Sequence, residues 1–162
     1  MTLLTTSRLP AIVSTTAVLS LLAASGPLQA QERAAWPVVG PIVRLPAIPW
    51  PNWKPGHRGI DLAIEPGSAV LSPAQGRVSW VGTVAGLPSV SVVSAGLKYT
   101  MQPVVSALTQ GDWVERGEVV GTVDVSDHCG VRTCLHWSVR RGSDYLDPRW
   151  VAVPLIRRGS PR

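Results

Sequence analysis

The stretch GRVSWVGTV at residues 76–84, followed by SVSVV at residues 89–93, decides the fold class. In both runs an apolar residue alternates with a small or polar one, so that one side of the extended chain is apolar. A period of two residues is typical of a β-strand with one buried face. These two runs therefore predict two strands of a half-buried sheet.

Short runs of Val, Ile and Leu continue from residue 57 onward, and Gly or Pro interrupts them about every eight to twelve residues, the spacing of antiparallel β-proteins. No segment after residue 30 keeps the three-to-four-residue apolar period of a helix. We therefore predict an all-β domain with an antiparallel β-sheet core. Its expected strands span residues 59–64, 69–72, 76–84, 89–93, 98–104, 112–114, 119–123 and 133–140.

Two short phrases are typical of tight turns between these strands. In Glu65-Pro66-Gly67, Pro and Gly occupy the two central positions that a type II turn prefers. In Glu115-Arg116-Gly117-Glu118, the single glycine permits the positive φ angle of a turn. Both phrases are expected to be structural.

Residues 1–30 have the composition of a secretory signal peptide. One cation, Arg8, precedes an apolar run at residues 11–24, and the small and polar stretch SGPLQA follows it. The apolar run is shorter than the roughly twenty residues that span a bilayer as a helix. We predict cleavage after Ala30 and a secreted or cell-envelope location, and the alternative is an uncleaved membrane anchor.

Residues 31–162 are enough for one domain with a single core. We divide them into a Pro- and Trp-rich extended lead-in at residues 31–56, a β-sheet core at residues 57–150 and a C-terminal tail at residues 151–162. Proline excludes a continuous helix or a central strand from the lead-in. Its tryptophans, Trp36, Trp50 and Trp53, are expected to pack against the domain, because large aromatic side chains gain much from burial.

The charge of the chain argues against nucleic acid as a partner. The sequence has 15 Lys and Arg against 10 Asp and Glu, a net charge of +5. These cations are spread thinly, whereas a nucleic-acid-binding surface has a denser basic stripe. A modest positive excess suits contact with anionic cell-wall polymers.

The two cysteines, Cys129 and Cys134, lie in the part of the chain expected to be exported, where disulfides persist. Their C-x₄-C spacing is longer than the C-x₂-C of a zinc knuckle, and the sequence has no second cysteine pair. A disulfide between them is the favoured interpretation, and a zinc-binding pair is the alternative.

An imidazole and a carboxylate lie four residues apart at His57 and Asp61. Because residues four apart in an extended chain point to the same side, both groups can contact one metal ion. His136, in the strand-prone run CLHW, adds a second imidazole. Two histidines and one aspartate with an open position form the ligand set of a catalytic zinc ion. The alternative is that His136 is an ordinary half-buried sheet residue.

Five motifs follow one another in order: HRGIDL at residues 57–62, PAQGRV at 73–78, GDWVERGEVVGTV at 111–123, CLHW at 134–137 and YLDP at 145–148. In this series the chain resembles the lysostaphin/LytM-type zinc metallopeptidases over residues 53–148. The resemblance implies the LytM-type fold, which is similar to the duplicated hybrid motif. It also implies Zn²⁺ as cofactor, with peptide stems or cross-bridges of peptidoglycan as substrates. Carried over by position, the zinc ligands are His57, Asp61 and His136.

The same family has two catalytic histidines that this sequence lacks. Cys134 stands at the first histidine of the family's H-x-H motif, and Pro103 stands where the family's Y-x-H-L segment has its histidine. Neither residue replaces an imidazole, because proline does not titrate and a thiol differs in proton affinity. His128 is the remaining imidazole and the candidate replacement for a catalytic histidine, and the alternative is an exposed loop residue.

The sequence leaves several hypotheses open. The chain is a weak or active zinc endopeptidase, or an inactive relative that binds wall peptide or regulates a partner wall hydrolase. In a third hypothesis, the ligand residues form a hydrogen-bonded cluster without metal. We expect a monomer.

Overall fold

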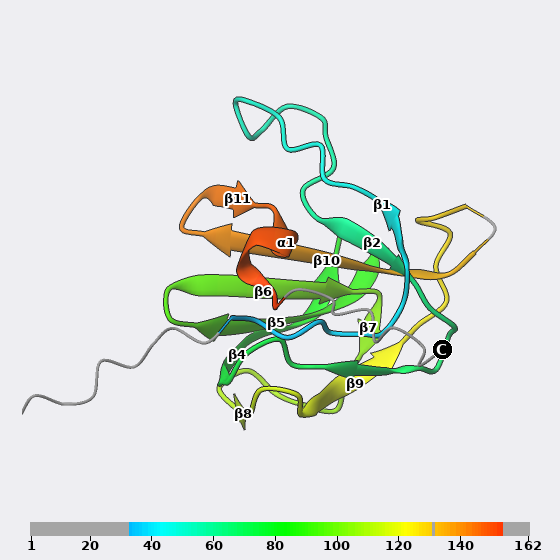
Figure 1. Ribbon diagram of the computed structural model, residues 1–162. Helices are drawn as coiled ribbons and strands as arrows, with labels where there is room; N and C mark the ends of the chain where they lie inside the picture. The colour runs from blue at the N-terminus through cyan, green and yellow to red at the C-terminus, as the bar shows by residue number, and fades with distance from the viewer. Residues whose placement is uncertain (1–32, 131, 154–162) are drawn as a thin grey trace, which may run out of the picture.

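The computed structural model describes residues 33–130 and 132–153, which form a β-structure with one short helix near the C-terminal end (Figure 1). The predicted signal peptide and most of the predicted tail lie outside the described residues. The elements are β1 (Ile42–Arg44), β2 (Ile60–Ala63), β3 (Ala69–Leu71), β4 (Gly76–Val84), β5 (Leu87–Ser94), β6 (Leu97–Gln102), β7 (Val104–Val105), β8 (Trp113–Val114), β9 (Val119–Val123), β10 (Cys134–Arg141), β11 (Asp144–Leu146) and α1 (Pro148–Val151).

Two antiparallel sheets make up the fold, which confirms the predicted all-β class. The larger sheet has the order β1-β2-β10-β6-β5-β4-β8, with β11 paired to β10. The smaller sheet has the order β3-β9-β7. Strand β10 lies between β2 and β6, so two segments far from it in sequence become its neighbours.

The two-residue period sorts the side chains of the larger sheet onto two faces. One parity of β2, β5, β6 and β10 supplies fully or nearly fully buried apolar residues: Ile60, Leu62, Val90, Val92, Leu97, Tyr99, Met101, Leu135, Trp137 and Val139. The other parity, which includes Asp61 and His136, faces the opposite side. The hydrophobic core thus fixes which side chains reach the polar face.

Both predicted turns form. The N–H of Ser68 donates to the carbonyl of Glu65 at 3.2 Å, and Gly67 has a φ of 80°, as a type II turn requires. The N–H of Glu118 donates to the carbonyl of Glu115 at 3.1 Å. Each turn joins segments at the places where the sequence pattern ends a strand.

Three short elements were not predicted, namely β1, β11 and α1. The predicted strand at residues 98–104 is interrupted, because Pro103 separates β6 from β7 and has no N–H to donate. Helix α1 follows Asp147, whose side chain accepts a hydrogen bond from the N–H of Arg149, and Pro148 occupies its first turn. No helix among the described residues has the length and apolar character needed to cross a membrane.

The lead-in lies partly on the domain. Strand β1 is an edge strand beside β2, and Trp36 packs edge-on against Trp137 with ring centroids 5.5 Å apart. The expectation for Trp50 and Trp53 was wrong, because these side chains are 86% and 78% exposed. They belong to residues 48–56, which we call the arm and which projects from the body in Figure 1.

Candidate metal centre and groove

The pairing of β2 with β10 brings two predicted ligands face to face. Asp61 and His136 are direct cross-strand partners, and both lie on the polar face of the larger sheet. Asp61 Oδ1 is 2.7 Å from His136 Nδ1. Asp61 is fully buried, so its carboxylate has little access to water.

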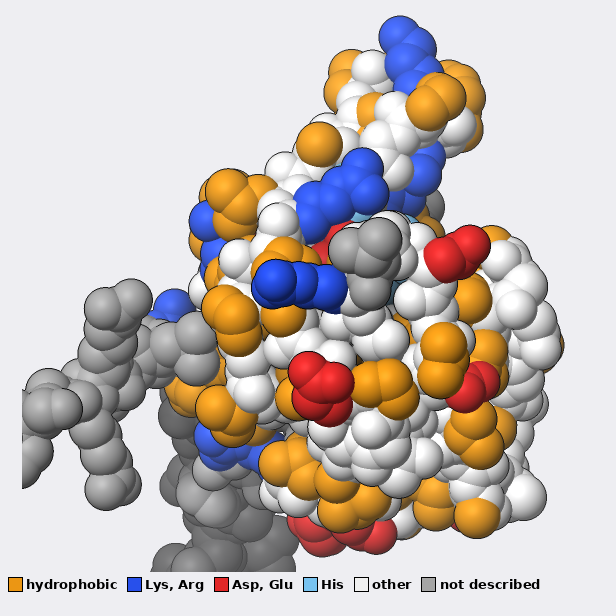
Figure 2. Space-filling view, turned by 90° about the vertical axis from the view of Figure 1, so that its right-hand side faces the viewer, with side chains coloured by type: hydrophobic (Ala, Val, Ile, Leu, Met, Phe, Trp, Pro, Cys, Tyr) orange, Lys and Arg blue, Asp and Glu red, His pale blue; other side chains and the backbone are white. Residues whose placement is uncertain are grey.

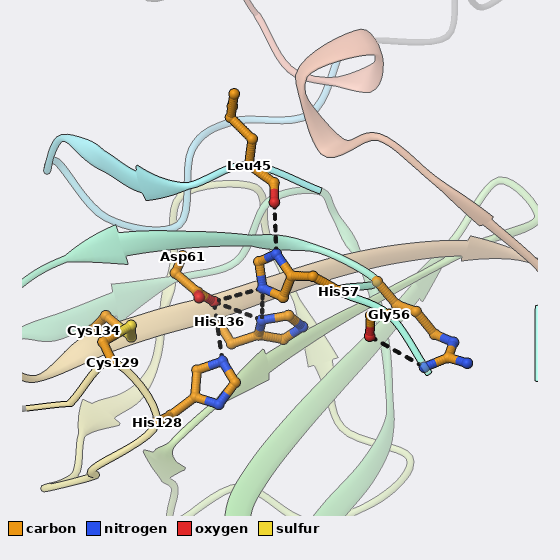
Figure 3. A network of polar contacts seen from close by, with 9 residues as sticks. Leu45, Gly56, His57, Asp61, His128, Cys129, Cys134 and His136 are labelled. Carbon is orange, nitrogen blue, oxygen red and sulfur yellow. Dashed lines mark hydrogen bonds and ion pairs between the residues drawn. A yellow bond between two sulfur atoms is a disulfide. The ribbon is translucent and has the colours of Figure 1, made fainter. Parts of the chain in front are cut away.

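His57 is held at the same point by the chain that precedes β2. Its backbone N–H and carbonyl bond to Ala47 at 3.1 and 2.8 Å. Its ring Nδ1 lies 2.8 Å from the carbonyl oxygen of Leu45 (Figure 3). Because a carbonyl only accepts, Nδ1 carries the proton, and a neutral His57 turns the lone pair of Nε2 toward Asp61 and His136.

The contacts of His57 Nε2 test whether these residues fit a metal ion. This atom lies 3.0 Å from Asp61 Oδ1 and 3.1 Å from His136 Nδ1. If His57 is neutral, its Nε2 and the ionised carboxylate of Asp61 are both hydrogen-bond acceptors and repel each other. A cation between the two atoms would remove this repulsion. Asp61 Oδ2 and His128 Nε2 are also buried without a hydrogen-bond partner. Imidazole nitrogens with one carboxylate oxygen are a donor set that suits zinc, so the residues fit the ion that the resemblance implies.

His128 lies at the same cluster, although it comes from the loop between β9 and β10. Its Nε2 is 3.3 Å from Asp61 Oδ1. One ligand atom from each of His57, Asp61, His128 and His136 lies within 4.8 Å of the others. The cluster can therefore offer four protein ligands.

Two hydrogen bonds and a disulfide hold the loop that carries His128. The N–H of His128 donates to Ser126 Oγ at 3.0 Å, and the N–H of Gly130 donates to the carbonyl of Asp127 at 2.8 Å. A disulfide joins Cys129 to Cys134, the first residue of β10 (Figure 3). The residue next to His128 is thus bonded covalently to the strand that carries His136.

Burial and charge set the protonation states at the cluster. Burial raises the pKa of Asp61, but its hydrogen bond with His136 and the surrounding imidazoles outweigh this, and its pKa lies below the usual value. Burial lowers the pKa of His136, Asp61 raises it, and the nearby imidazoles of His57 and His128 lower it again, so that its pKa lies below the usual value. An ionised carboxylate and a neutral imidazole are the forms that bind a metal ion.

A groove of about 510 Å³ extends from the cluster along the polar face. Its floor is hydrogen-bonded across strands, because Ser91 Oγ lies 2.8 Å from Thr100 Oγ1 and Ser89 Oγ donates to Gln102 Oε1 at 3.2 Å. In Figure 2 a small part of the His surface is visible next to Asp or Glu and to Lys and Arg side chains. The residues that line the groove are Gly56, His57, Arg58, Trp80, Val84, Ala85, Ser91, Lys98, Thr100, Gln102, His128, His136, Ser138, Arg140 and Tyr145.

The structure brings together the four histidine and aspartate residues singled out from the sequence. Tyr99 is buried in the core on the other face, away from the cluster. The groove residues Lys98 and Arg140 were missed. Arg140 lies an even number of residues from His136 on the same strand, and Lys98 is its partner on β6, so both point to the same face as His136. This spacing was the signal that could have identified them.

These features define an antiparallel β-domain in which a cluster of His and Asp side chains that could hold a metal ion lies at one end of a polar groove. The model of peptidase family M23 matches residues 55–148, and the chain belongs to this family.

The chain is also similar in sequence to a known relative and in fold to solved structures. The chain is 36% identical over 137 residues to an uncharacterized protein of Mycobacterium tuberculosis, covering 80% of this chain and 55% of that protein. The chain thus spans about half the length of that relative. Its fold is similar to a zinc-containing peptidase from Vibrio cholerae, with TM-score 0.64 and 19% identity over 76% of this chain and 41% of that one. Helicobacter pylori Csd3 is similar with TM-score 0.63 and 24% identity over 75% and 35% of the two chains.

Proposed function

We propose that this chain is an exported, zinc-binding M23 domain that binds peptidoglycan peptides in its groove without hydrolysing them. His57, Asp61 and His136 would hold the zinc ion. When bound, zinc supplies a Lewis acid that polarises a peptide carbonyl and lowers the pKa of water. The similarity to a zinc-containing peptidase supports the choice of metal.

The observation that carries the proposal is the disulfide at Cys134. The lysostaphin/LytM resemblance assigns a catalytic histidine to this position, and a disulfide sulfur neither accepts nor donates a proton. Pro103 stands at the other catalytic position and has no titratable side chain. Loss of general acid–base catalysis and of transition-state stabilisation typically costs about 100-fold or more each. Binding without efficient turnover follows.

His128 supplies a second reason for low turnover. A catalytic zinc ion keeps one position open, whereas a structural zinc ion is closed by four protein ligands. The Nε2 of His128 is buried without a hydrogen-bond partner and lies 3.3 Å from Asp61 Oδ1, beside the other donors. We assign it as a fourth ligand, which would occupy the position that a water molecule or a substrate carbonyl needs.

A second candidate function is weak hydrolysis with His128 as the replacement catalytic histidine. The position of its imidazole over the cluster favours this candidate too, because a general base must lie within reach of a zinc-bound water. The two candidates differ in what His128 does for activity and for metal affinity.

Zinc content and peptidoglycan digestion, measured on one preparation with and without a chelator, test the proposal. We expect stoichiometric zinc with no chelator-sensitive digestion. His128→Ala should weaken zinc affinity by at least about tenfold, since even an outer-shell partner contributes that much. Asp127→Ala, an exposed neighbour in the same loop, is the control and should leave zinc affinity unchanged.

The other outcomes are equally informative. Chelator-sensitive digestion that disappears in His128→Ala, with zinc retained, would establish the second candidate and overturn binding without turnover. Absence of zinc from the wild-type protein would overturn the metal assignment and leave the hydrogen-bonded cluster of the third hypothesis.

A further inference from the structure

Two cations face each other on the floor of the groove. Lys98 of β6 and Arg140 of β10 are direct cross-strand partners. Both line the groove and are half-buried. Like charges directly opposite each other on one face destabilise a sheet. This pair is therefore a cost to the fold that some other interaction must offset.

No described carboxylate offsets it. Among the described residues, neither the side chain of Lys98 nor that of Arg140 makes a hydrogen bond or ion pair, and no Asp or Glu lines the groove. Burial, followed by the charge of Arg140, lowers the pKa of Lys98. The field at this point repels positive charge and favours an anion.

The position of the pair relative to the cluster fits a peptide ligand. Arg140 is four residues from His136 along β10, which is about 13 Å at the rise of an extended chain. Ser138 and Thr100, which are cross-strand partners on the same face, lie between the two sites and offer hydroxyl groups. An extended peptide with one end at the cluster would reach the cations about four residues away.

We infer that Lys98 and Arg140 form a subsite for a carboxylate of the bound wall peptide, about four residues from the metal cluster. This rests on the proposed function, because it specifies the ligand of the same groove. The guanidinium of Arg140 can donate two parallel hydrogen bonds to a carboxylate, and the ammonium of Lys98 adds a compact positive charge from the neighbouring strand. A bound carboxylate would also relieve the repulsion between the two cations.

The experiment measures binding of synthetic stem peptides to the zinc-loaded wild-type protein by calorimetry. One peptide carries all its carboxylates, and in the others each carboxylate is converted in turn to an amide. We expect one amidation to weaken binding by about 10- to 100-fold, the range for hydrogen bonds to charged groups. The double variant Lys98→Gln, Arg140→Gln should bind the acid and that amide equally.

Arg141→Gln is the matched control, because Arg141 is the next residue, is exposed and has the opposite parity on β10. It should keep the full preference for the carboxylate. The melting temperature of Arg140→Gln should equal or exceed that of the wild type, which shows that lost binding does not reflect unfolding.

The outcomes separate this inference from the proposed function. Tight binding of all peptides with no preference for any carboxylate would overturn the subsite and leave the groove function intact. A preference that survives in the double variant would place the carboxylate elsewhere and overturn the subsite as well. Failure of the wild type to bind any stem peptide would overturn both.

Discussion

At the scale of single residues, Gly59 explains how the two ligand strands approach each other. A Cβ atom at this position would lie 2.4 Å from the carbonyl oxygen of Trp137 and 2.8 Å from Nε2 of His136. Both distances are far below van der Waals contact, so the imidazole of His136 packs directly over the glycine backbone. The glycine of the HRGID motif is thus part of the proposed metal site although it has no ligand atom.

Gly59→Ala is expected to damage both stability and metal binding. The extra methyl group must separate β2 from β10 or displace His136, and overpacking of this kind costs about 1–3 kcal/mol. We expect a lower free energy of unfolding in urea and at least about tenfold weaker zinc affinity in competition with a chelator, comparable to losing a partner of a ligand. A folded variant with wild-type zinc affinity would contradict this role of Gly59.

Asp147 is a second residue with a definite effect, at the start of α1. Its Oδ1 accepts from the backbone N–H of Arg149 at 3.0 Å, and the guanidinium Nε of Arg149 donates to both carboxylate oxygens. Burial raises the pKa of Asp147, but these hydrogen bonds and the charge of Arg149 together lower it by more, so its pKa lies below the usual value.

The sign of the pH effect follows from this lowered pKa. The stabilisation by Asp147 is fully present above the ordinary carboxyl pKa of about 3.9 and disappears as the pH falls through the folded-state value. Asp147→Ala should cost about 1 kcal/mol at neutral pH, as for other N-caps. Urea unfolding at pH 7 and at pH 2.5 measures it, and the difference between variant and wild type should shrink at the lower pH. An equal difference at both values would show that the carboxylate charge is irrelevant.

At the scale of elements, the loop between β9 and β10 links the disulfide to the proposed metal site. Cys129 follows His128 directly, and Cys134 begins the strand that carries His136. The disulfide therefore restricts His128 to the neighbourhood of the other ligands. The disulfide should therefore affect zinc affinity only by positioning the imidazole of His128.

Cys129→Ser, Cys134→Ser should lower both stability and zinc affinity. Chain entropy for so short a loop predicts a loss of about 2 kcal/mol. The zinc affinity should fall by the same factor as in His128→Ala, and adding His128→Ala to the serine variant should produce no further loss, since both changes remove one interaction. Additive losses in chelator competition would indicate that the disulfide acts on the site by another route.

The elements also show what the sequence could and could not predict. Alternation identified most strands, and turn chemistry located Gly67 and Gly117. The register that opposes Asp61 to His136 came only from the family resemblance, because alternation fixes the face of a strand but not its partner. The inward position of His128 depends on the packing of an irregular loop. No periodic pattern encodes such a position, which is why an exposed loop residue stayed open as the alternative for His128.

At the scale of the whole molecule, the fold extends beyond the segment that matches the family. Ala34 pairs with the chain after α1, since its N–H donates to Val151 and its carbonyl accepts from Val153, both at 2.8 Å. The indole N–H of Trp36 donates to the carbonyl of Val153 at 2.8 Å. The beginning and end of the described chain are thus fastened together over Trp137, on the core side of the strand that carries His136.

Two tryptophans of the same lead-in make a matched test of this arrangement. Trp36 packs against the fully buried Trp137, whereas Trp50 in the arm is 86% exposed. Trp36→Ala should lower the free energy of unfolding by about 2–4 kcal/mol, toward the range for large core residues, because it removes aromatic packing and a hydrogen bond. Trp50→Ala should change it by no more than about 0.5 kcal/mol, as for other surface substitutions. Urea denaturation of both variants decides between two outcomes. Equally small losses would mean that the lead-in is not part of the folded domain. A large loss only at Trp36 would mean that the domain begins before residue 55, where the family match starts.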